Sequence, residues 1–276
     1  MKSLLNIVFC FLLSAAALFL FSCNKDDVVS NGGQQTELSY AKIFTVQSGA
    51  AKFEVYSASG SGMIYGYNDI GFKVFIDGNE KNSGSVKFKP MMYHSIGGPG
   101  HSSPVSPEYL YSSEYNLFKG YACFTMISDS SAMWFADYVY NDLYAVDSAF
   151  FTVTAVSGKQ LAYWDDVNHG GTYCLTLIKP FTVSAGANEF TCILHRTNDD
   201  INFAEIDSAS MIIKTYFEQS GEVSQNNINP AWKGGGIYTG SVNFTKTGKW
   251  HVLDTIYHNN SRITKNSPPD FVFTVH

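Results

Sequence analysis

The sequence predicts an all-β protein made of two tandem immunoglobulin-like β-sandwiches, which follow a lipoprotein signal peptide and a short flexible linker. Three observations predict this fold. Beyond residue 38 no apolar pattern repeats every 3.6 residues, as a helix would require. Short runs of β-branched and aromatic residues instead end at turn residues, which is typical of strands. These runs recur in the same order in two halves of the chain, which indicates a duplication.

Composition excludes two classes of protein. Aromatic residues make up 15% of the 276 residues and charged residues only 15%, whereas a disordered chain is rich in charge and poor in aromatics. The net charge is −6, and the sequence contains no cluster of basic residues. Binding to phosphates needs clustered Lys and Arg, so we expect no nucleic-acid partner.

Residues 1–22 have the features of an export signal. Lys2 is followed by an apolar run, Leu4–Phe21, which Asn6 and Ser14 interrupt. The run ends at Ser22-Cys23, which resembles the lipobox of bacterial lipoproteins. That resemblance implies cleavage before Cys23 and acyl chains on its sulfur, so that the membrane is a partner of the mature chain. An ordinary secretory signal or an uncleaved anchor remains an alternative.

The rest of the chain divides into three parts. Residues 23–38 form the lipidated Cys and a linker, because the segment contains Gly32-Gly33 and has almost no apolar residues after Val29. We expect the first sandwich at 39–156 and the second at 157–276. The anchor predicts a location in the cell envelope, on the outer membrane, at its periplasmic face or at the cell surface.

The strands of the two halves correspond in order. Strand-like runs that end at turn residues or at proline occur at 72–76, 120–126, 172–178 and 241–245. The pairs of segments that indicate the duplication include Gly66–Ile70 with Gly186–Phe190, Val86–Lys89 with Met211–Lys214, Pro107–Tyr109 with Pro230–Trp232, Gly120–Thr125 with Gly240–Thr245, Trp134 with Trp250, and 149–154 with 270–275. Each half has about the length of one small sandwich domain.

The segment Lys89–Ser95 is the most unusual in the chain. Together with the Gly120–Met126 strand and the Trp134 strand, it resembles the YtkA-like (FixH-related) β-sandwich family. The second half matches through Trp232, Gly234–Gly236 and the following strand to Trp250. This resemblance implies an exported accessory protein, linked to copper or to cytochrome-oxidase assembly, with a protein partner in the envelope.

Four residues of this region are candidate metal ligands: Met91, Met92, His94 and His101. Thioether sulfur and imidazole nitrogen suit copper, particularly Cu(I). On a strand Met92 and His94 point to one face and Met91 to the other, and the following loop can return His101 to His94. Met126 or Met133 are further candidates for a sulfur ligand. In the alternative interpretation the methionines fill the core and both histidines lie on a solvated loop.

The second half has no such cluster, because its equivalent segment, Lys214–Ser220, contains neither Met nor His. Three Cys remain after Cys10 and Cys23 are assigned to the leader and the anchor. Cys174 and Cys192 flank one turn, so we expect either a disulfide between them or two buried thiols. Cys123 has no obvious partner.

No catalytic signature occurs in the chain, neither a nucleophile elbow nor a P-loop nor a His-Glu-x-x-His motif. We therefore expect a non-enzymatic protein that binds or delivers copper through the Met91–His101 loop. The alternative is a cell-surface module that binds a protein or a glycan without metal. An exposed Trp232, beside Gly234–Gly236, is expected in that case.

Overall fold

The computed structural model describes residues 39–60, 62–95, 100–166, 170–180, 182–264 and 268–276. Residues 39–276 form one compact unit. The described residues contain strands and turns and no α-helix, which confirms the predicted all-β fold. Accordingly, none of the described segments is a helix that could span a membrane. The signal peptide, Cys23 and the linker lie outside the described residues, and so do residues 96–99 of the loop before His101.

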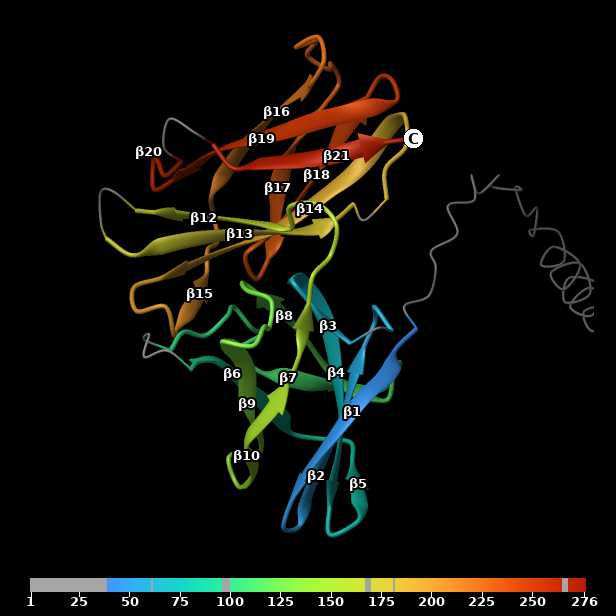
Figure 1. The fold of residues 1–276 in the computed structure, drawn as a ribbon, viewed down its shortest axis with the longest axis vertical. Coiled ribbons are helices and arrows are strands. Elements are labelled where there is room, and N and C mark those ends of the chain that lie inside the picture. The colour runs from blue at the N-terminus through green and yellow to red at the C-terminus, as the bar shows by residue number, and fades with distance from the viewer. Residues whose placement is uncertain (1–38, 61, 96–99, 167–169, 181, 265–267) are drawn as a thin grey trace, which may run out of the picture. The chain divides into compact units, whose positions relative to one another are not determined.

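The first sandwich contains β1 to β11 (Figure 1). Its strands are β1 (Ala41–Ser48), β2 (Ala51–Ser57), β3 (Met63–Ile64), β4 (Gly66–Ile76), β5 (Asn79–Lys81), β6 (Ser85–His94), β7 (Tyr109–Ser112), β8 (Leu117–Phe124), β9 (Ala132–Tyr140), β10 (Tyr144–Phe151) and β11 (Val153–Thr154). The sheet order is β1-β2-β4-β8-β7-β6-β9-β10, with β5 on β4, and β11 pairs with β3. Because β7 pairs with both β8 and β6, it joins the two layers.

The second sandwich contains β12 to β21. Its strands are β12 (Leu161–Asp165), β13 (Thr172–Lys179), β14 (Gly186–Thr197), β15 (Phe203–Glu205), β16 (Ser210–Phe217), β17 (Ile228–Gly234), β18 (Ile237–Phe244), β19 (Gly248–His258), β20 (Ser261–Arg262) and β21 (Asp270–Val275). One sheet has the order β12-β13-β14-β18-β17, with β15 on β14. The other has the order β16-β19-β20, with β21 on β19.

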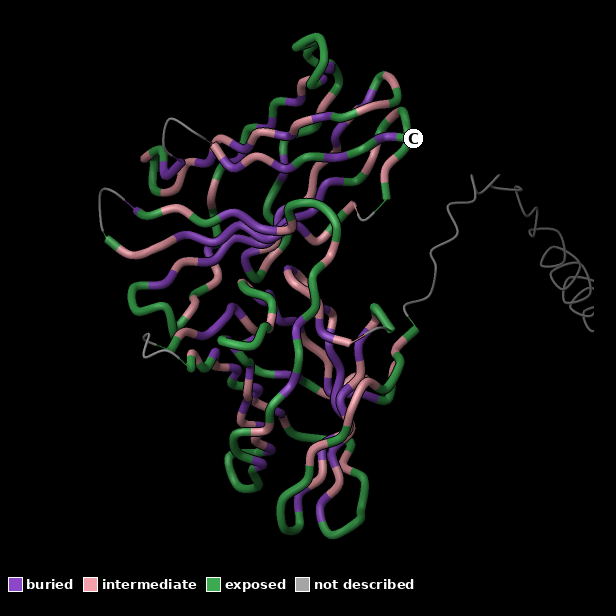
Figure 2. The backbone as a smooth tube through the Cα atoms, in the orientation of Figure 1, coloured by how far each residue is buried: buried purple, intermediate pink, exposed green. Residues whose placement is uncertain are grey.

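The two sandwiches repeat the same pairings. Strand β4 pairs with β8 as β14 pairs with β18, and each pairing opens with a glycine opposite a phenylalanine. These are Gly66 opposite Phe124 and Gly186 opposite Phe244. Each core is lined by alternate residues of its strands, which Figure 2 shows as the regular change between buried and exposed positions. Trp134 and Trp250 occupy equivalent, fully buried positions.

The possible disulfide between Cys174 and Cys192 is not formed, and both thiols are free and buried, like that of Cys123. The register of the β13–β14 pair explains why. Cys174 lies opposite His195, whereas Cys192 lies opposite Leu177. The two cysteines are therefore offset by three residues, or about 10 Å along the strands. A disulfide requires Cα atoms within about 7 Å of each other.

The two sandwiches pack against each other through a small apolar cluster that includes Tyr121, Cys123 and Ile193. At its edge the Tyr121 hydroxyl donates to Glu205 Oε1 (2.6 Å) and lies 2.9 Å from His195 Nε2. Since the single phenolic proton goes to the carboxylate, the imidazole is the donor to the phenol oxygen. Burial lowers the pKa of His195 to about 3, so the ring is neutral at physiological pH.

The core of the second sandwich contains an acid. Asp254 on β19 is fully buried, and neither of its carboxyl oxygens has a hydrogen-bond partner among the described residues. Burial, with a smaller contribution from the charge of Asp270, raises the pKa of Asp254 well above its usual range. The folded protein therefore keeps a proton that the unfolded chain releases.

Because the folded protein retains this proton, we expect its free energy of unfolding to depend on pH. Because the pKa of Asp254 is raised in the folded state, stability falls as the pH rises above about 4, by up to about 1.4 kcal/mol per pH unit. We expect Asp254→Asn to remove this loss, so that its stability relative to wild type is higher near pH 8 than near pH 5. Urea unfolding at both pH values measures the difference, with the exposed Asp147→Asn as control. An equal difference at the two pH values would contradict the account.

Candidate metal site

The site begins where β6 ends, on the inner face of the first sandwich. Met92 is buried in the core opposite Trp134, and His94 follows two positions later on the same face. Met91 lies opposite Phe135 on the outer face of the sheet. The alternation therefore brings Met92 and His94 together and separates Met91 from both.

The chain returns to this point at His101. The backbone N–H of Met92 donates to the carbonyl of His101 (2.7 Å), in an isolated antiparallel bridge. Residues opposite each other in such a bridge project their side chains to the same face. The rings of His94 and His101 lie 5.6 Å apart between centroids, and the rings of His101 and Trp134 meet edge to face with centroids 5.5 Å apart.

The nearest sulfur to His101 belongs to Met126, which follows β8. Its Sδ lies 3.2 Å from Nε2 of His101, while Nδ1 lies 3.0 Å from the carbonyl oxygen of Ser102. Because a carbonyl oxygen only accepts, the contact with Ser102 favours the ring with its proton on Nδ1, which leaves Nε2 as an acceptor beside the thioether. Two lone pairs thus face each other. A soft metal ion that accepted both lone pairs would satisfy this contact, and an Nδ1–H···O=C bond is the usual support of a ligating histidine.

Met126 is positioned by the same contact that the duplicated half uses. The indole N–H of Trp134 donates to the carbonyl of Met126 (2.9 Å), and that of Trp250 donates to the carbonyl of Lys246 (2.9 Å). Lys246 therefore occupies the place of Met126 in the second sandwich. Phe217, which lies opposite Trp250, occupies the place of Met92. The second sandwich has the scaffold and lacks the ligands.

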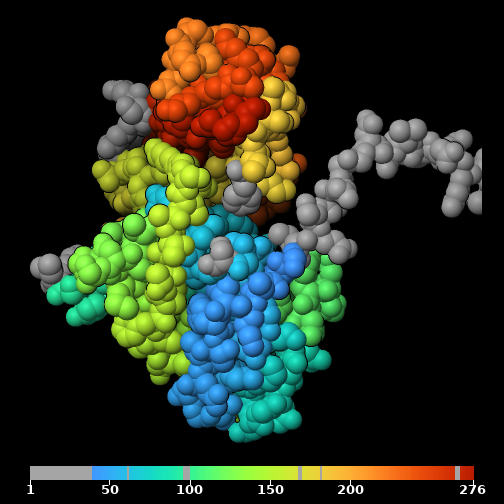
Figure 3. All heavy atoms as spheres, turned by 45° about the vertical axis from the view of Figure 1, so that its right-hand side comes forward, coloured from blue at the N-terminus to red at the C-terminus, as the bar shows by residue number. Residues whose placement is uncertain are grey.

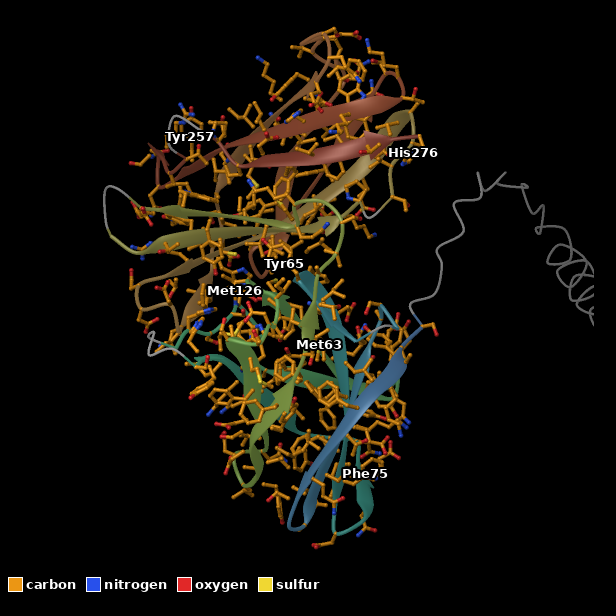
Figure 4. All side chains as sticks on the ribbon, in the orientation of Figure 1. Met63, Tyr65, Phe75, Met126, Tyr257 and His276 are labelled. Carbon is orange, nitrogen blue, oxygen red and sulfur yellow. The ribbon has the colours of Figure 1, made fainter. Side chains whose placement is uncertain are left out.

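The site opens on a cavity of about 410 Å³ between the two sandwiches. His101 and Met126 line it from the first sandwich, and Tyr163, Asp199 and Asp200 line it from the second. Figure 4 labels Met126 at the end of the first sandwich that faces the second. The backbone N–H of Ser102 donates to the carbonyl of Asp200 (2.8 Å), so the segment that carries His101 is also tied to the second sandwich.

The cavity wall of the second sandwich is negative. The backbone N–H and the side-chain amide of Asn202 donate to Asp199, and these bonds hold the pKa of its carboxyl well below its usual range. Asp199 is therefore ionised throughout the physiological pH range. Its oxygens are occupied by its own turn, so it attracts cations to the cavity without serving as a ready ligand.

The donor set fits a soft metal ion. A nitrogen and a sulfur that bind one ion at about 2.0 and 2.3 Å stand roughly 3 to 3.5 Å apart, as His101 Nε2 and Met126 Sδ do. Two imidazoles and a thioether favour Cu(I) over harder ions. Within the described residues no cluster of three or more His, Cys, Asp or Glu side chains is positioned to hold a metal.

His101 lies close to two other candidate ligands, His94 and Met126. Met92 is adjacent but buried beneath them, and Met91 and Met133 lie on the outer face of the sheet. The sequence does not identify Tyr163 or Asp199 as neighbours of the site. No local signal could have done so, because the packing of one sandwich on the other places them there.

No protein-family model matches the sequence, and no curated protein matches it. Among solved structures, the Escherichia coli adhesin FdeC is similar at 11% identity and a TM-score of 0.26, over 85% of this chain and 66% of that chain. The chain thus spans slightly less than two thirds of the adhesin structure. Domains 5–6 of the S-layer protein SbsC are similar at 10% identity and a TM-score of 0.29, over 86% of this chain and 98% of that chain. These values are too low to transfer a function to this chain.

The hydrogen bond to Ser102 predicts the tautomer of His101. We expect the metal-free neutral ring to carry its proton on Nδ1, whereas free imidazole side chains favour Nε2. Nitrogen-15 NMR shifts of the two ring nitrogens distinguish the tautomers, and the exposed His276 serves as the reference. Protonation of His101 on Nε2 would contradict the proposed orientation of its lone pair.

Proposed function

We propose that this chain is an exported, non-enzymatic binding protein that holds one copper ion, as Cu(I), at His94, His101 and Met126. The single observation that carries the proposal is the 3.2 Å approach of His101 Nε2 to Met126 Sδ. A histidine nitrogen without a proton and a thioether without one have no hydrogen bond to share. A soft cation could be coordinated by both the nitrogen and the sulfur.

The other residues of the site have supporting roles in this proposal. His94 would supply the second imidazole, and the buried thioether of Met92 is a candidate for a fourth ligand. The Trp134 indole fixes the backbone at Met126 and covers one side of His101. Asp199 and Asp200 raise the local concentration of cations at the cavity. Copper would be bound here because it prefers soft ligands, and the proposal assigns it no reaction.

The copper proposal predicts a selective loss of binding. We expect one equivalent of Cu(I) to bind to the purified protein in competition with a chromogenic chelator. Met126→Leu should weaken this binding at least tenfold, because it removes the sulfur and keeps the volume. Met133→Leu is the matched control, since Met126 and Met133 are 41% and 43% exposed and only Met133 lies on the outer face.

Equal affinities of the Met126→Leu and Met133→Leu proteins would remove Met126 from the site. Absence of binding in the wild type would end the copper proposal. His101→Phe should weaken binding at least as much as Met126→Leu. The tryptophan fluorescence of each variant verifies that the core around Trp134 is intact.

The place of the protein in the cell follows from its N-terminus. We propose that acyl chains on Cys23 hold it in the outer membrane and that residues 24–38 tether the sandwiches to it. The lipobox-like Ser22-Cys23 and the polar segment after it support this proposal. We further propose that an envelope protein is the donor or acceptor of the ion.

A second candidate function is a cell-surface interaction module that needs no metal. Trp232 supports it, because the side chain is 49% exposed on the edge strand β17. Asp207 accepts a hydrogen bond from its indole N–H (2.7 Å), and this bond orients the ring at the surface. An exposed, oriented tryptophan suits contact with a protein or a glycan. Trp232→Ala separates the candidates, because it removes this surface and leaves the copper site unchanged.

A further inference from the structure

The outer face of the first sandwich is apolar where the sheet ends. Three neighbouring strands, β6, β9 and β10, contribute five side chains to it, which we call the aromatic face. Met91 lies opposite Phe135, Tyr93 lies opposite Met133, and Phe135 in turn lies opposite Phe150. Antiparallel sheets usually present polar side chains on the face that does not cover a core.

Three of these side chains, Tyr93, Met133 and Phe150, are exposed to solvent. Tyr93 is 55% and Phe150 is 58% exposed, and Met133 is exposed to a similar degree. The rings of Phe135 and Phe150 lie 5.8 Å apart and form a continuous surface. Met91 and Phe135 are half-buried, and Met91 borders a cavity that Ser102 and Phe203 also line. A contiguous exposed apolar surface of this kind is typical of a site that contacts a membrane or another protein.

The charged residues of these strands lie further along the sheet. Lys89 is opposite Asp137, and Lys87 forms an ion pair with Asp142 at 2.8 Å. No charged residue occupies any of the five positions of the aromatic face. The outer surface of the three strands is therefore divided along their length into an apolar part and a part with paired charges.

The described chain begins at Ser39, which the proposed tether precedes. Ser39 leads into β1, which lies against β10, and Figure 3 shows the two strands side by side. Phe44 of β1 stacks on Phe151 at 6.2 Å, and Phe151 adjoins Phe150. Residues 23–38 span no more than about 55 Å even when fully extended. A lipid anchor on Cys23 therefore keeps the bilayer within reach of this face at all times.

We propose that the aromatic face rests on the bilayer that holds the acyl chains of Cys23. Tyr and Phe side chains prefer the boundary between headgroups and acyl chains, and methionine adapts to its irregular surface. The covalent tether makes this bilayer the surface with the highest effective concentration. The proposal rests on the lipid anchor proposed above and is independent of copper. It gives the protein a defined orientation on the membrane.

The test uses the full acylated chain, reconstituted in vesicles of phosphatidylethanolamine and phosphatidylglycerol. A nitroxide is attached at Phe150→Cys, and Ile228→Cys in the second sandwich is the matched control, because Ile228 is equally prominent at 64% exposure. The native thiols do not interfere. Cys123, Cys174 and Cys192 are fully buried, and burial raises the pKa of each thiol.

We expect the label at position 150 to become accessible to oxygen and shielded from a water-soluble nickel complex. Relative to the same protein in detergent, the ratio of the two accessibilities should rise at least about twofold, and the label at 228 should not change. Tyr93→Ser, combined with the label at 150, should reduce this rise, because it removes a second aromatic contact.

The mass of the N-terminal peptide shows whether Cys23 carries acyl chains, and this separates a failure of the membrane contact from a failure of the anchor. If Cys23 carries its acyl chains and the label at 150 stays in water, the membrane contact is wrong while the anchor stands. If Cys23 carries no acyl chain, the anchor itself fails and the membrane contact fails with it. Dipolar broadening between labels at 150 would mean that a second copy covers the aromatic face, which also contradicts the proposal.

Discussion

The register of β6 against β9 determines both what the first sandwich buries and what it displays. With Met92 opposite Trp134, every second residue of β6 faces the core and the residues between them face outward. Met92 and His94 therefore belong to the proposed copper site, and Met91 and Tyr93 belong to the aromatic face. A slip of one residue would exchange the two sets, so both surfaces depend on this one pairing. The buried Trp134 opposes such a slip, because its indole would be exposed and its bond to Met126 lost.

The second sandwich is an internal comparison for the first. It keeps the glycine that opens the central pairing, the buried tryptophan and the bond from its indole to a backbone carbonyl. These features hold the fold together, since both copies need them. Met126 has become Lys246, and the strand end equivalent to Met92 and His94 carries no Met or His. The ligands are thus additions to a scaffold that folds without them, which agrees with a binding role confined to the first copy.

Much of this arrangement follows from local pattern. Strand positions, the order shared by the two halves and the opposite faces of Met91 and Met92 all come from the two-residue period of strands and from turn residues. The register between strands cannot be derived from this local pattern. Cys174 and Cys192 are symmetric about their turn in sequence, yet the pairing offsets them by three residues. Likewise, only the packing of whole elements brings Met126, rather than Met133, to His101, and places Asp199 across the cavity.

The most direct test of the central claim is X-ray absorption at the copper edge of the loaded protein. The account predicts two nitrogen ligands near 2.0 Å and at least one sulfur near 2.3 Å. The sulfur scattering should decrease in Met126→Leu and remain unchanged in Met133→Leu. A copper ion surrounded only by nitrogen and oxygen, or an unchanged sulfur shell in Met126→Leu, would contradict it.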